Sequence, residues 1–400
     1  MTKIKSIALL LSFILICSCE KSSTEKKLKV EIDTYLKEQI QMQQIPGLAL
    51  GVIKNGNIVY EGYFGKADLE NNTHVNKNTL FPVYSITKLI VSTGIFQLVE
   101  QNKISLEDTI SKYIENTPKN WQHIKIKNLL THSSGLPDFG IAGGEISDAD
   151  IWLRITNEKM HYETGNQFEY NQTNYWFLAK IIEKVSGVSF DKFIIDNQFN
   201  KDTNNILFSS DLGYNFLNRA SRHEFNNKKE KYDISKIYGG KRFHAVNGMN
   251  ITLRELIKWN SRLDNGSLLG NEQKQNMWKP FQFNNKKDDF LHGWHTYSFD
   301  NNNNSYGFTG GGHTGFRKFL KNDLTIIVFT NGHKYFSTHN DIINRVAGIV
   351  DEKLIIKKGV VQHEILSAFL TKNTEEAIER YYVVRNKNPE NNVEIKERPW

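Results

Sequence analysis

Residues 81–98 read FPVYSITKLIVSTGIFQL, and this stretch decides the fold that we expect. Pro82 marks a turn, and the apolar residues after it occupy nearly every side of the helical period, which is typical of a central helix enclosed by other elements. Ser85 and Lys88 are three residues apart, so on a helix their side chains lie on one face and can meet. The stretch therefore predicts a buried helix with a serine and a lysine near its first turn.

A serine and a lysine in this arrangement have a chemical use. A serine hydroxyl is a weak nucleophile until a neighbouring base takes its proton, and a desolvated lysine can be that base. A helix N-terminus adds partial positive charge and free backbone N–H groups. The spacing alone is not specific, because it also occurs at Ser18/Lys21, Ser23/Lys26 and Ser189/Lys192. Only Ser85 has a buried helix behind it, so it is the candidate nucleophile.

The N-terminal residues have a different character from the rest. Lys3 and Lys5 precede an apolar run from Ile7 to Ile16, and Cys17-Ser18-Cys19 follows. This is the pattern of a secretory signal. Its end resembles a bacterial lipoprotein signal, in which Cys19 becomes the lipidated first residue, and the alternative is an ordinary signal peptide cut nearby. We predict a signal over residues 1–18, a tether over 19–29, and an exported envelope protein that a lipid holds to a membrane, on its periplasmic or outer-membrane face.

Composition limits the remaining classes. The chain has 400 residues, of which 39% are hydrophobic, so it can bury a large core. Cys17 and Cys19 are its only cysteines, which excludes thiol catalysis and cysteine-ligated zinc in the folded body. The net charge is +7, but the Lys/Asn-rich runs at 226–231 and 284–287 lack interleaved aromatic residues. They favour solvated loops, and no nucleic-acid partner is expected.

The order of predicted elements indicates how the chain is organised. Strand patterns occur near both ends, at about 48–60 and 296–330, and a mainly helical block of about 100–249 lies between them. Such an order predicts one sheet built from distant segments, with the helical part inserted. The other expected elements are helices over 31–44, 175–185, 251–263 and 342–350, an Asn55-Gly56 hairpin turn, and a helical and polar appendix over 351–400.

Three segments together resemble one family. Ser85-Ile86-Thr87-Lys88, Tyr170-Asn171-Gln172 and His313-Thr314-Gly315 follow the order and approximate separations of the active-site motifs of serine β-lactamase-like and penicillin-binding proteins, especially the class C branch. Residues 45–47, 129–137 and 246–249 support the resemblance, which covers about residues 30–350. It implies an α/β (α+β) fold with an antiparallel sheet flanked by helices and an inserted, mainly helical subdomain.

The resemblance also implies roles for individual residues. Ser85 would be the acylated nucleophile, Lys88 its proton partner and Tyr170 the shared general base and acid. A tyrosine has an ordinary pKa of about 10, so it can serve only if cations favour its phenolate or if it relays a proton from Lys88. The resemblance places His313, Thr314 and Gly315 on the strand that edges the pocket. The backbone N–H groups of Ser85 and Phe316 would form the oxyanion hole.

Two residues depart from the family pattern. Gln172 replaces the usual asparagine of the second motif, and its extra methylene is expected to move the amide that touches the substrate and Lys88. His313 replaces the lysine of the third motif, so recognition of a substrate carboxylate should be weaker and more dependent on pH. Such histidine variants look like the esterase and peptidase branches of the family.

Other candidate residues have simpler interpretations. His132, Ser133 and Ser134 look catalytic in isolation, but the family uses this segment as a structural turn. Tyr175 fits the apolar face of a helix, and His292 with His295 reads as two ordinary polar residues rather than a metal site. No Gly-x-Ser-x-Gly segment occurs, which disfavours an α/β-hydrolase. We expect no cofactor and no metal.

Three functions remain open from the sequence. The first is an envelope serine hydrolase that forms an acyl-enzyme on Ser85 from an ester, a peptide ending in a D-amino acid or a β-lactam-like amide, with a small-molecule or peptidoglycan-derived substrate. The second is a membrane-tethered binding module without useful catalysis, which Gln172 and the short segment after Gly315 suggest. The third is a partner-binding role for the appendix from residue 362 onward.

Overall fold

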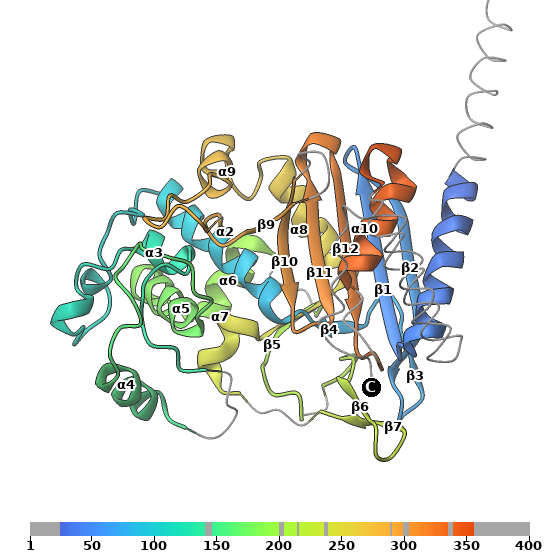
Figure 1. Cartoon of the computed structure of the whole chain (residues 1–400), viewed down its shortest axis with the longest axis horizontal. Helices are drawn as coiled ribbons and strands as arrows, with labels where there is room; N and C mark the ends of the chain where they lie inside the picture. The colour runs from blue at the N-terminus through green and yellow to red at the C-terminus, as the bar shows by residue number, and fades with distance from the viewer. Residues whose placement is uncertain are drawn as a thin grey trace, which may run out of the picture.

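The computed structural model describes residues 25–140, 146–199, 204–213, 216–235, 239–288, 290–298, 304–334 and 339–355. Strands from both ends of the chain form a seven-stranded antiparallel sheet in the order β3-β2-β1-β12-β11-β10-β9 (Figure 1). Helices cover it, which confirms the expected α/β (α+β) fold. The strands are β1 Gly47–Lys54, β2 Asn57–Asp68, β3 Thr73–His74, β9 His295–Ser298, β10 Asn304–Gly310, β11 Thr314–Phe319 and β12 Leu324–Thr330.

The turn between β1 and β2 forms where the sequence predicts it. Asn55 and Gly56 both have positive φ angles, 50° and 72°. Two successive positive angles are those of a two-residue hairpin turn whose twist matches the flanking strands, and Asn-Gly is the sequence that adopts it most readily. This turn brings β2 back along β1.

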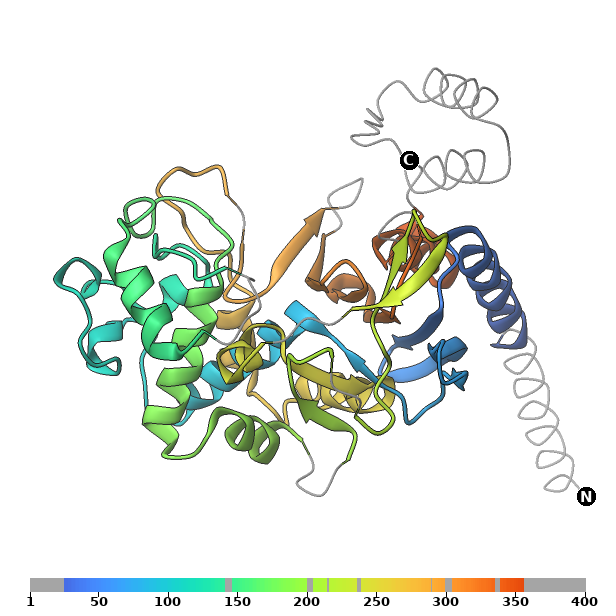
Figure 2. The same cartoon turned by 90° about the horizontal axis from the view of Figure 1, so that it is seen from below.

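Separate apolar cores lie on the two faces of the sheet. A helix over residues 25–43 and α10 (His339–Val350) pack against one face, through residues such as Leu36, Val328 and Ile342. α2 (Thr87–Glu100) and α8 (Leu253–Asp264) pack against the other face. Figure 2 shows the same arrangement from below, with the helical block beside the sheet.

Helix α2 has the enclosed position expected of it. Every residue from Thr87 to Leu98 is buried, and α5, α6, α7 and α9 surround the helix. Enclosure stabilises a helix that is apolar on all sides, because each large apolar side chain that it buries contributes about 1.5–3 kcal/mol of hydrophobic stabilisation. The bounds of the other helices are α3 Ile126–Leu130, α4 Asp148–Asn157, α5 Gln172–Ser186, α6 Phe190–Gln198, α7 His244–Asn247 and α9 Asn271–Met277.

Short strands lie within the helical block and at its borders, where the sequence showed mainly helical periodicity. They form a small sheet in the order β4-β8-β5 and a separate hairpin, β6-β7. The helix expected to begin at Ile251 begins at Leu253 instead. Ile251 and Thr252 belong to a strand between two partners, and the Thr252 side chain accepts a hydrogen bond from Glu255 N to cap α8. These strands are β4 Leu80–Pro82, β5 Ile206–Phe208, β6 His223–Asn226, β7 Lys231–Ile234 and β8 Met249–Thr252.

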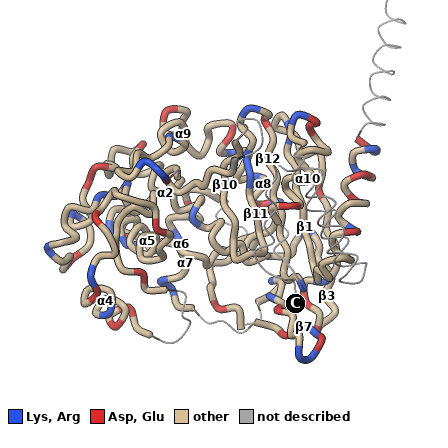
Figure 3. Tube along the Cα trace, viewed as in Figure 1, with Lys and Arg blue, Asp and Glu red and all other residues tan. Residues whose placement is uncertain are grey.

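Several terminal expectations fall outside the described residues: the signal over 1–18, Cys19, and the appendix beyond residue 355. Of the expected tether, residues 25–29 are the start of the helix over 25–43. No helix in the described ranges has the length and apolarity needed to cross a membrane. Basic and acidic residues are intermixed over the described part of the fold (Figure 3).

Candidate active site

Ser85 lies in a tight turn between strand β4 and helix α2. The 3₁₀ turn η1 spans Tyr84–Ile86, and Tyr84 has a φ of 48°, a left-handed conformation that is uncommon for a tyrosine. Such a conformation costs about 1–3 kcal/mol and persists only where surrounding structure holds it. Here Val83 N donates to Met249 O at 2.9 Å and Thr314 Oγ1 donates to Val83 O at 3.1 Å. The turn presents Ser85 at the head of α2.

The Ser85 hydroxyl has two polar side chains near it. Its Oγ is 2.7 Å from the phenolic oxygen of Tyr170 and 3.5 Å from Nζ of Lys88. The second motif therefore meets the first, although 85 residues separate Ser85 and Tyr170 in sequence. A hydroxyl in contact with both a phenol and an amine has two routes by which its proton can leave.

Lys88 is fully buried, and its amine is held by acceptors. Nζ donates to Gln172 Oε1 at 3.1 Å and to the carbonyl of Val246 at 2.8 Å. Burial lowers the pKa of Lys88 to about 7, with Asp138 acting weakly in the opposite direction. The amine is therefore available as a base near neutral pH. The longer side chain of Gln172 still reaches Lys88, in contrast to the displacement expected from the sequence.

Tyr170 has an environment that favours its neutral form. Burial raises the pKa of the phenol above its usual value of about 10, and the hydrogen bonds with Ser85 and Gln172 oppose that rise. The side chain is 36% exposed at the mouth of the site, so solvent moderates the effect of burial. The Lys88 amine lies 4.8 Å from the centre of the Tyr170 ring. Tyr170 is thus a protonated phenol that can pass a proton, with Lys88 as the stronger base.

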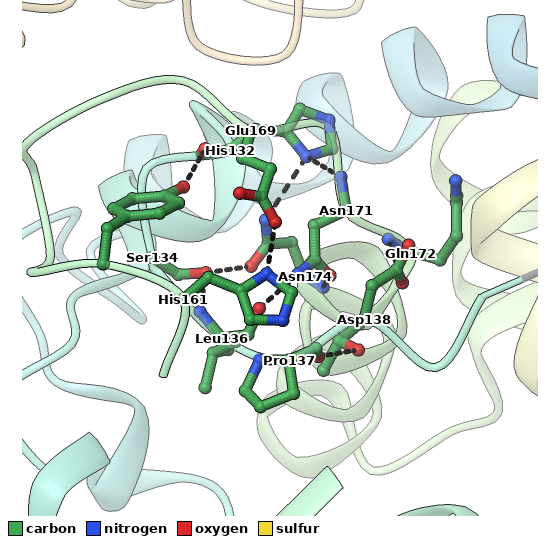
Figure 4. Close-up of polar contacts among 12 residues, drawn as sticks. His132, Ser134, Leu136, Pro137, Asp138, His161, Glu169, Asn171, Gln172 and Asn174 are labelled. Atoms are coloured by element: carbon green, nitrogen blue, oxygen red, sulfur yellow. Dashed lines mark hydrogen bonds and ion pairs between the residues drawn. The ribbon is translucent and has the colours of Figure 1, made fainter. Parts of the chain in front are cut away.

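A polar network fixes the start of α5 at Asn171 and Gln172 (Figure 4), directly after Tyr170 in the chain. Gln172 N donates to Asp138 Oδ1 at 2.9 Å, and Asn171 N donates to His132 Nδ1 at 3.1 Å. The His132 ring also packs against Tyr170 at 4.7 Å between centroids. Burial holds the pKa of His132 well below its usual value, so this ring is neutral. The 132–138 segment acts here as a structural support, the role that the sequence analysis gave it.

The third motif lies elsewhere than expected. His313 precedes β11, whose backbone is paired with both β10 and β12. The His313 ring is buried and lies 4.9 Å from that of His333. Burial, with smaller effects of His333 and Arg222, lowers the pKa of His313 to about 2. His313 is therefore neutral at pH 7, not partly charged.

The neighbours of His313 do not line the pocket either. A Cβ on Gly315 would lie 2.6 Å from Ile343 in α10, on the far face of the sheet. Thr314 donates a hydrogen bond to the carbonyl of Val83, in the turn before Ser85, so its side chain supports that turn. Phe316 is fully buried and paired on both sides, with Phe308 and with Ile327. Its backbone amide belongs to the sheet interior, so the oxyanion role expected for Phe316 does not fit this structure.

The strand that borders the site is β10. Strand β9 pairs with it only as far as Gly307, so the edge from Phe308 to Gly310 has no strand beside it in the described part of the chain. The Phe308 ring lies 6.1 Å from that of Tyr170. A Cβ on Gly310 would lie 2.2 Å from Val83 O, so only glycine permits this approach. The sequence contains Thr-Gly at both 309–310 and 314–315, and the first pair is the one beside Ser85.

Within the described ranges, no group of three or more His, Cys, Asp or Glu side chains could hold a metal ion. His292 is buried, and burial lowers its pKa to about 4.

Comparisons with known proteins match the chain to a family model and to several relatives. A family model described as Beta-lactamase matches residues 32–348. Protein flp of Staphylococcus aureus (strain MW2) is 27% identical over 176 residues, which are 42% of this chain and 35% of flp. The chain thus matches only about a third to a half of the length of such curated relatives.

Two solved structures have the same fold. The octameric penicillin-binding protein homologue from Pyrococcus abyssi superposes with a TM-score of 0.69 and 20% identity, over 84% of this chain and 80% of that one. The D-amino acid amidase from Ochrobactrum anthropi SV3, complexed with L-phenylalanine, has a TM-score of 0.66 and 20% identity, over 77% and 95% of the two chains. At this identity the likeness establishes the fold alone.

Proposed function

We propose, from the premise that this chain belongs to the beta-lactamase family, that it is a serine hydrolase which forms an acyl-enzyme on Ser85. The observation that carries the proposal is the contact of one hydroxyl with both a phenol and a buried amine, at 2.7 and 3.5 Å. Family members of this fold hydrolyse acyl compounds, and the chain keeps the groups that such chemistry needs.

Acylation begins with the removal of the Ser85 proton. Lys88, with a pKa of about 7, accepts the proton directly or through the Tyr170 hydroxyl, and Oγ attacks the substrate carbonyl carbon. The tetrahedral intermediate then collapses, and the bond to the leaving oxygen or nitrogen breaks. The protonated Tyr170 lies at the mouth of the site, so it can donate a proton to the leaving group and regain one from Lys88.

Deacylation repeats the sequence with water. A water molecule gives a proton to the same Lys88 and Tyr170 pair and attacks the acyl carbon, which releases a carboxylic acid and restores the Ser85 hydroxyl. The charge on the carbonyl oxygen needs N–H donors in both steps. We propose the Ser85 N–H and a backbone donor on the open edge of β10 near Thr309, in place of Phe316.

The substrate class that fits is an ester or an amide, including amides and peptides of D-amino acids. The name of the O. anthropi neighbour supports an amide substrate, and peptidoglycan-derived compounds belong to the same chemical class. Whether a β-lactam is turned over depends on how the site receives the carboxylate of such a substrate.

Covalent labelling tests the proposal. The purified protein is incubated with a fluorescent fluorophosphonate, and the adduct is located by mass spectrometry. We expect an adduct on Ser85 that is absent from Ser85→Ala. If wild type labels no better than Ser85→Ala, while ligands still raise its melting temperature, the binding module that the sequence left open is the better account.

We also propose that the protein is exported and held to an envelope membrane by a lipid on Cys19. The basic and apolar N-terminal pattern before Cys17-Ser18-Cys19 supports it. Cells that express the full chain should incorporate radiolabelled palmitate into the protein, and Cys19→Ala should abolish the label. Label that persists in Cys19→Ala would exclude this anchor.

A further inference from the structure

The wall of the site beside the nucleophile is aromatic. Phe308 stands at the open edge of β10, with its ring 6.1 Å from Tyr170 and 6.3 Å from Phe290. Phe308 is 6% exposed, so its ring is buried against these two aromatic side chains and makes this side of the site apolar. A phenylalanine offers neither a positive charge nor a hydrogen-bond donor to that substrate.

The charge that acts on the catalytic groups is negative. Asp138 accepts a hydrogen bond from Gln172 N at 2.9 Å, and the same Gln172 accepts from Lys88 at 3.1 Å, so the carboxylate is one residue removed from the catalytic amine. Asp138 is also the charged side chain that raises the pKa of both Lys88 and Tyr170, because its negative charge disfavours the loss of a proton. In the described part of the chain, the hydrogen bonds of the Lys88 amine and the Tyr170 hydroxyl involve no arginine and no second lysine.

Two other candidate cations near this end of the sheet, Arg317 and His313, do not face the site. Arg317 is buried on the far face of the sheet, where its guanidinium donates to the carbonyl of Phe308 and to Asn340 of α10. His313, the cation expected from the sequence, is a neutral ring against His333. Lys88 itself donates to Gln172, to Val246 and to the Ser85 hydroxyl.

From these observations we propose that Phe308 and Asp138 make the site select substrates whose leaving group carries no carboxylate. A carboxylate that enters beside Phe308 loses water without gaining a partner, and it approaches the negative charge of Asp138. Neutral esters and amides do not incur this penalty. The inference rests on the proposed acyl-enzyme chemistry at Ser85 and narrows it to uncharged substrates, so penicillins and peptides with a free terminal carboxylate are poor substrates.

Two phenyl esters of phenylacetic acid test the inference, one with a meta carboxylate on the phenol and one with a meta carboxamide. The two esters share an acyl group and a similar shape, and they differ in one charge. Dividing each enzymatic rate by the rate of the same ester with hydroxide corrects for intrinsic reactivity. A hydrogen bond to a charged group is commonly worth on the order of ten- to a hundredfold, so we expect wild type to prefer the carboxamide in kcat/KM by about tenfold or more. Equal rates, or a preference for the carboxylate, would overturn the inference.

The same assay separates this inference from the function on which it rests. If neither ester is hydrolysed faster by wild type than by Ser85→Ala, the proposed hydrolase function fails. If both are hydrolysed through Ser85 at equal corrected rates, the hydrolase stands and only the charge selection fails.

Variants then assign the selection to residues. Phe308→Lys should raise kcat/KM for the carboxylate ester selectively, whereas Leu153→Lys adds the same charge on an exposed position of α4 and should leave the ratio unchanged. Asp138→Asn keeps an acceptor for Gln172 N and removes the charge, so it remains informative if Phe308→Lys does not fold. We expect it to reduce the discrimination several-fold. If Asp138→Asn changes kcat/KM by the same factor for both esters, Asp138 acts only through Lys88, and a role of Asp138 in the selection is excluded.

Discussion

The phenolic oxygen of Tyr170 lies 2.7 Å from Oγ of Ser85, close enough to exchange a proton with it. We predict that Tyr170→Phe keeps the fold and loses activity, because the ring contacts with His132 and Phe308 remain while the proton relay is removed. The expected fall in kcat is on the order of a hundredfold or more. Steady-state kinetics on a phenyl ester measure it, with circular dichroism to check the fold. Tyr175→Phe, in the adjacent core tyrosine, is the matched control and should stay active; normal turnover in Tyr170→Phe would remove the phenol from the mechanism.

Lys88 gives the second prediction, a rise of activity with pH. The proposed base is the neutral amine, and burial lowers the pKa of Lys88 to about 7. Below that pH the amine is protonated and cannot accept the Ser85 proton, so kcat/KM should increase about tenfold per pH unit up to about pH 7 and then level off. A pH–rate profile on a neutral ester between pH 5 and 9 measures it. A profile that is flat across this range would contradict the assignment of Lys88 as the base.

Gln172 gives the third prediction. Its Oε1 accepts from the Lys88 amine, as do the carbonyl of Val246 and, at the longer distance of 3.5 Å, the Ser85 hydroxyl. Gln172→Ala removes one of these three acceptors, and we expect kcat to fall by roughly tenfold or more, since a hydrogen bond to a charged group contributes about 1.5–3 kcal/mol. Gln172→Asn restores the amide that the family normally has and should keep more activity than Gln172→Ala. Equal activity of the two variants would mean that the amide does not hold Lys88.

The sequence predicts correctly those elements that depend on neighbouring residues alone. Asn55-Gly56 has the backbone freedom for a hairpin turn, and Gly187, with a φ of 73°, ends α5 where the sequence placed its stop. The unbroken apolar character of α2 could be satisfied only by enclosure. Ser85 and Lys88 are joined by one helical turn, so their proximity also followed from spacing.

What sequence did not predict depends on contacts between distant segments. Ile251 has a helical pattern after it, but pairing with β4 and β5 makes it a strand. The two Thr-Gly pairs at 309–310 and 314–315 look equivalent along the chain. The extent of strand pairing decides between them: β9 pairs with β10 only as far as Gly307, so residues 308–310 have no strand on that side in the described part of the chain, whereas β11 is paired on both sides. For this reason the sequence wrongly predicts that His313 and Phe316 line the pocket.

The buried His313 gives the fourth prediction, a loss of stability in acid. Burial lowers the pKa of His313 to about 2 in the folded protein, whereas the unfolded chain has an ordinary histidine pKa of about 6.5. Below about pH 6.5 the unfolded state therefore binds a proton that the folded state does not. The stability that this ring contributes is fully present above pH 6.5 and is lost as the pH falls, by up to about 1.4 kcal/mol per pH unit.

Urea unfolding at pH 7.5 and pH 5.0 measures this loss, and His313→Gln supplies the comparison. Glutamine does not titrate in this range, so the variant should lose less free energy of unfolding between the two pH values than wild type does. The groups around position 313 are His333, His339 and Arg222, and they titrate or stay charged in both proteins. The buried Asp341, whose pKa burial raises to about 6, is also present in both. The difference between the two proteins therefore isolates one imidazole, and an equal pH dependence in both would show that His313 takes up its proton without unfolding the protein.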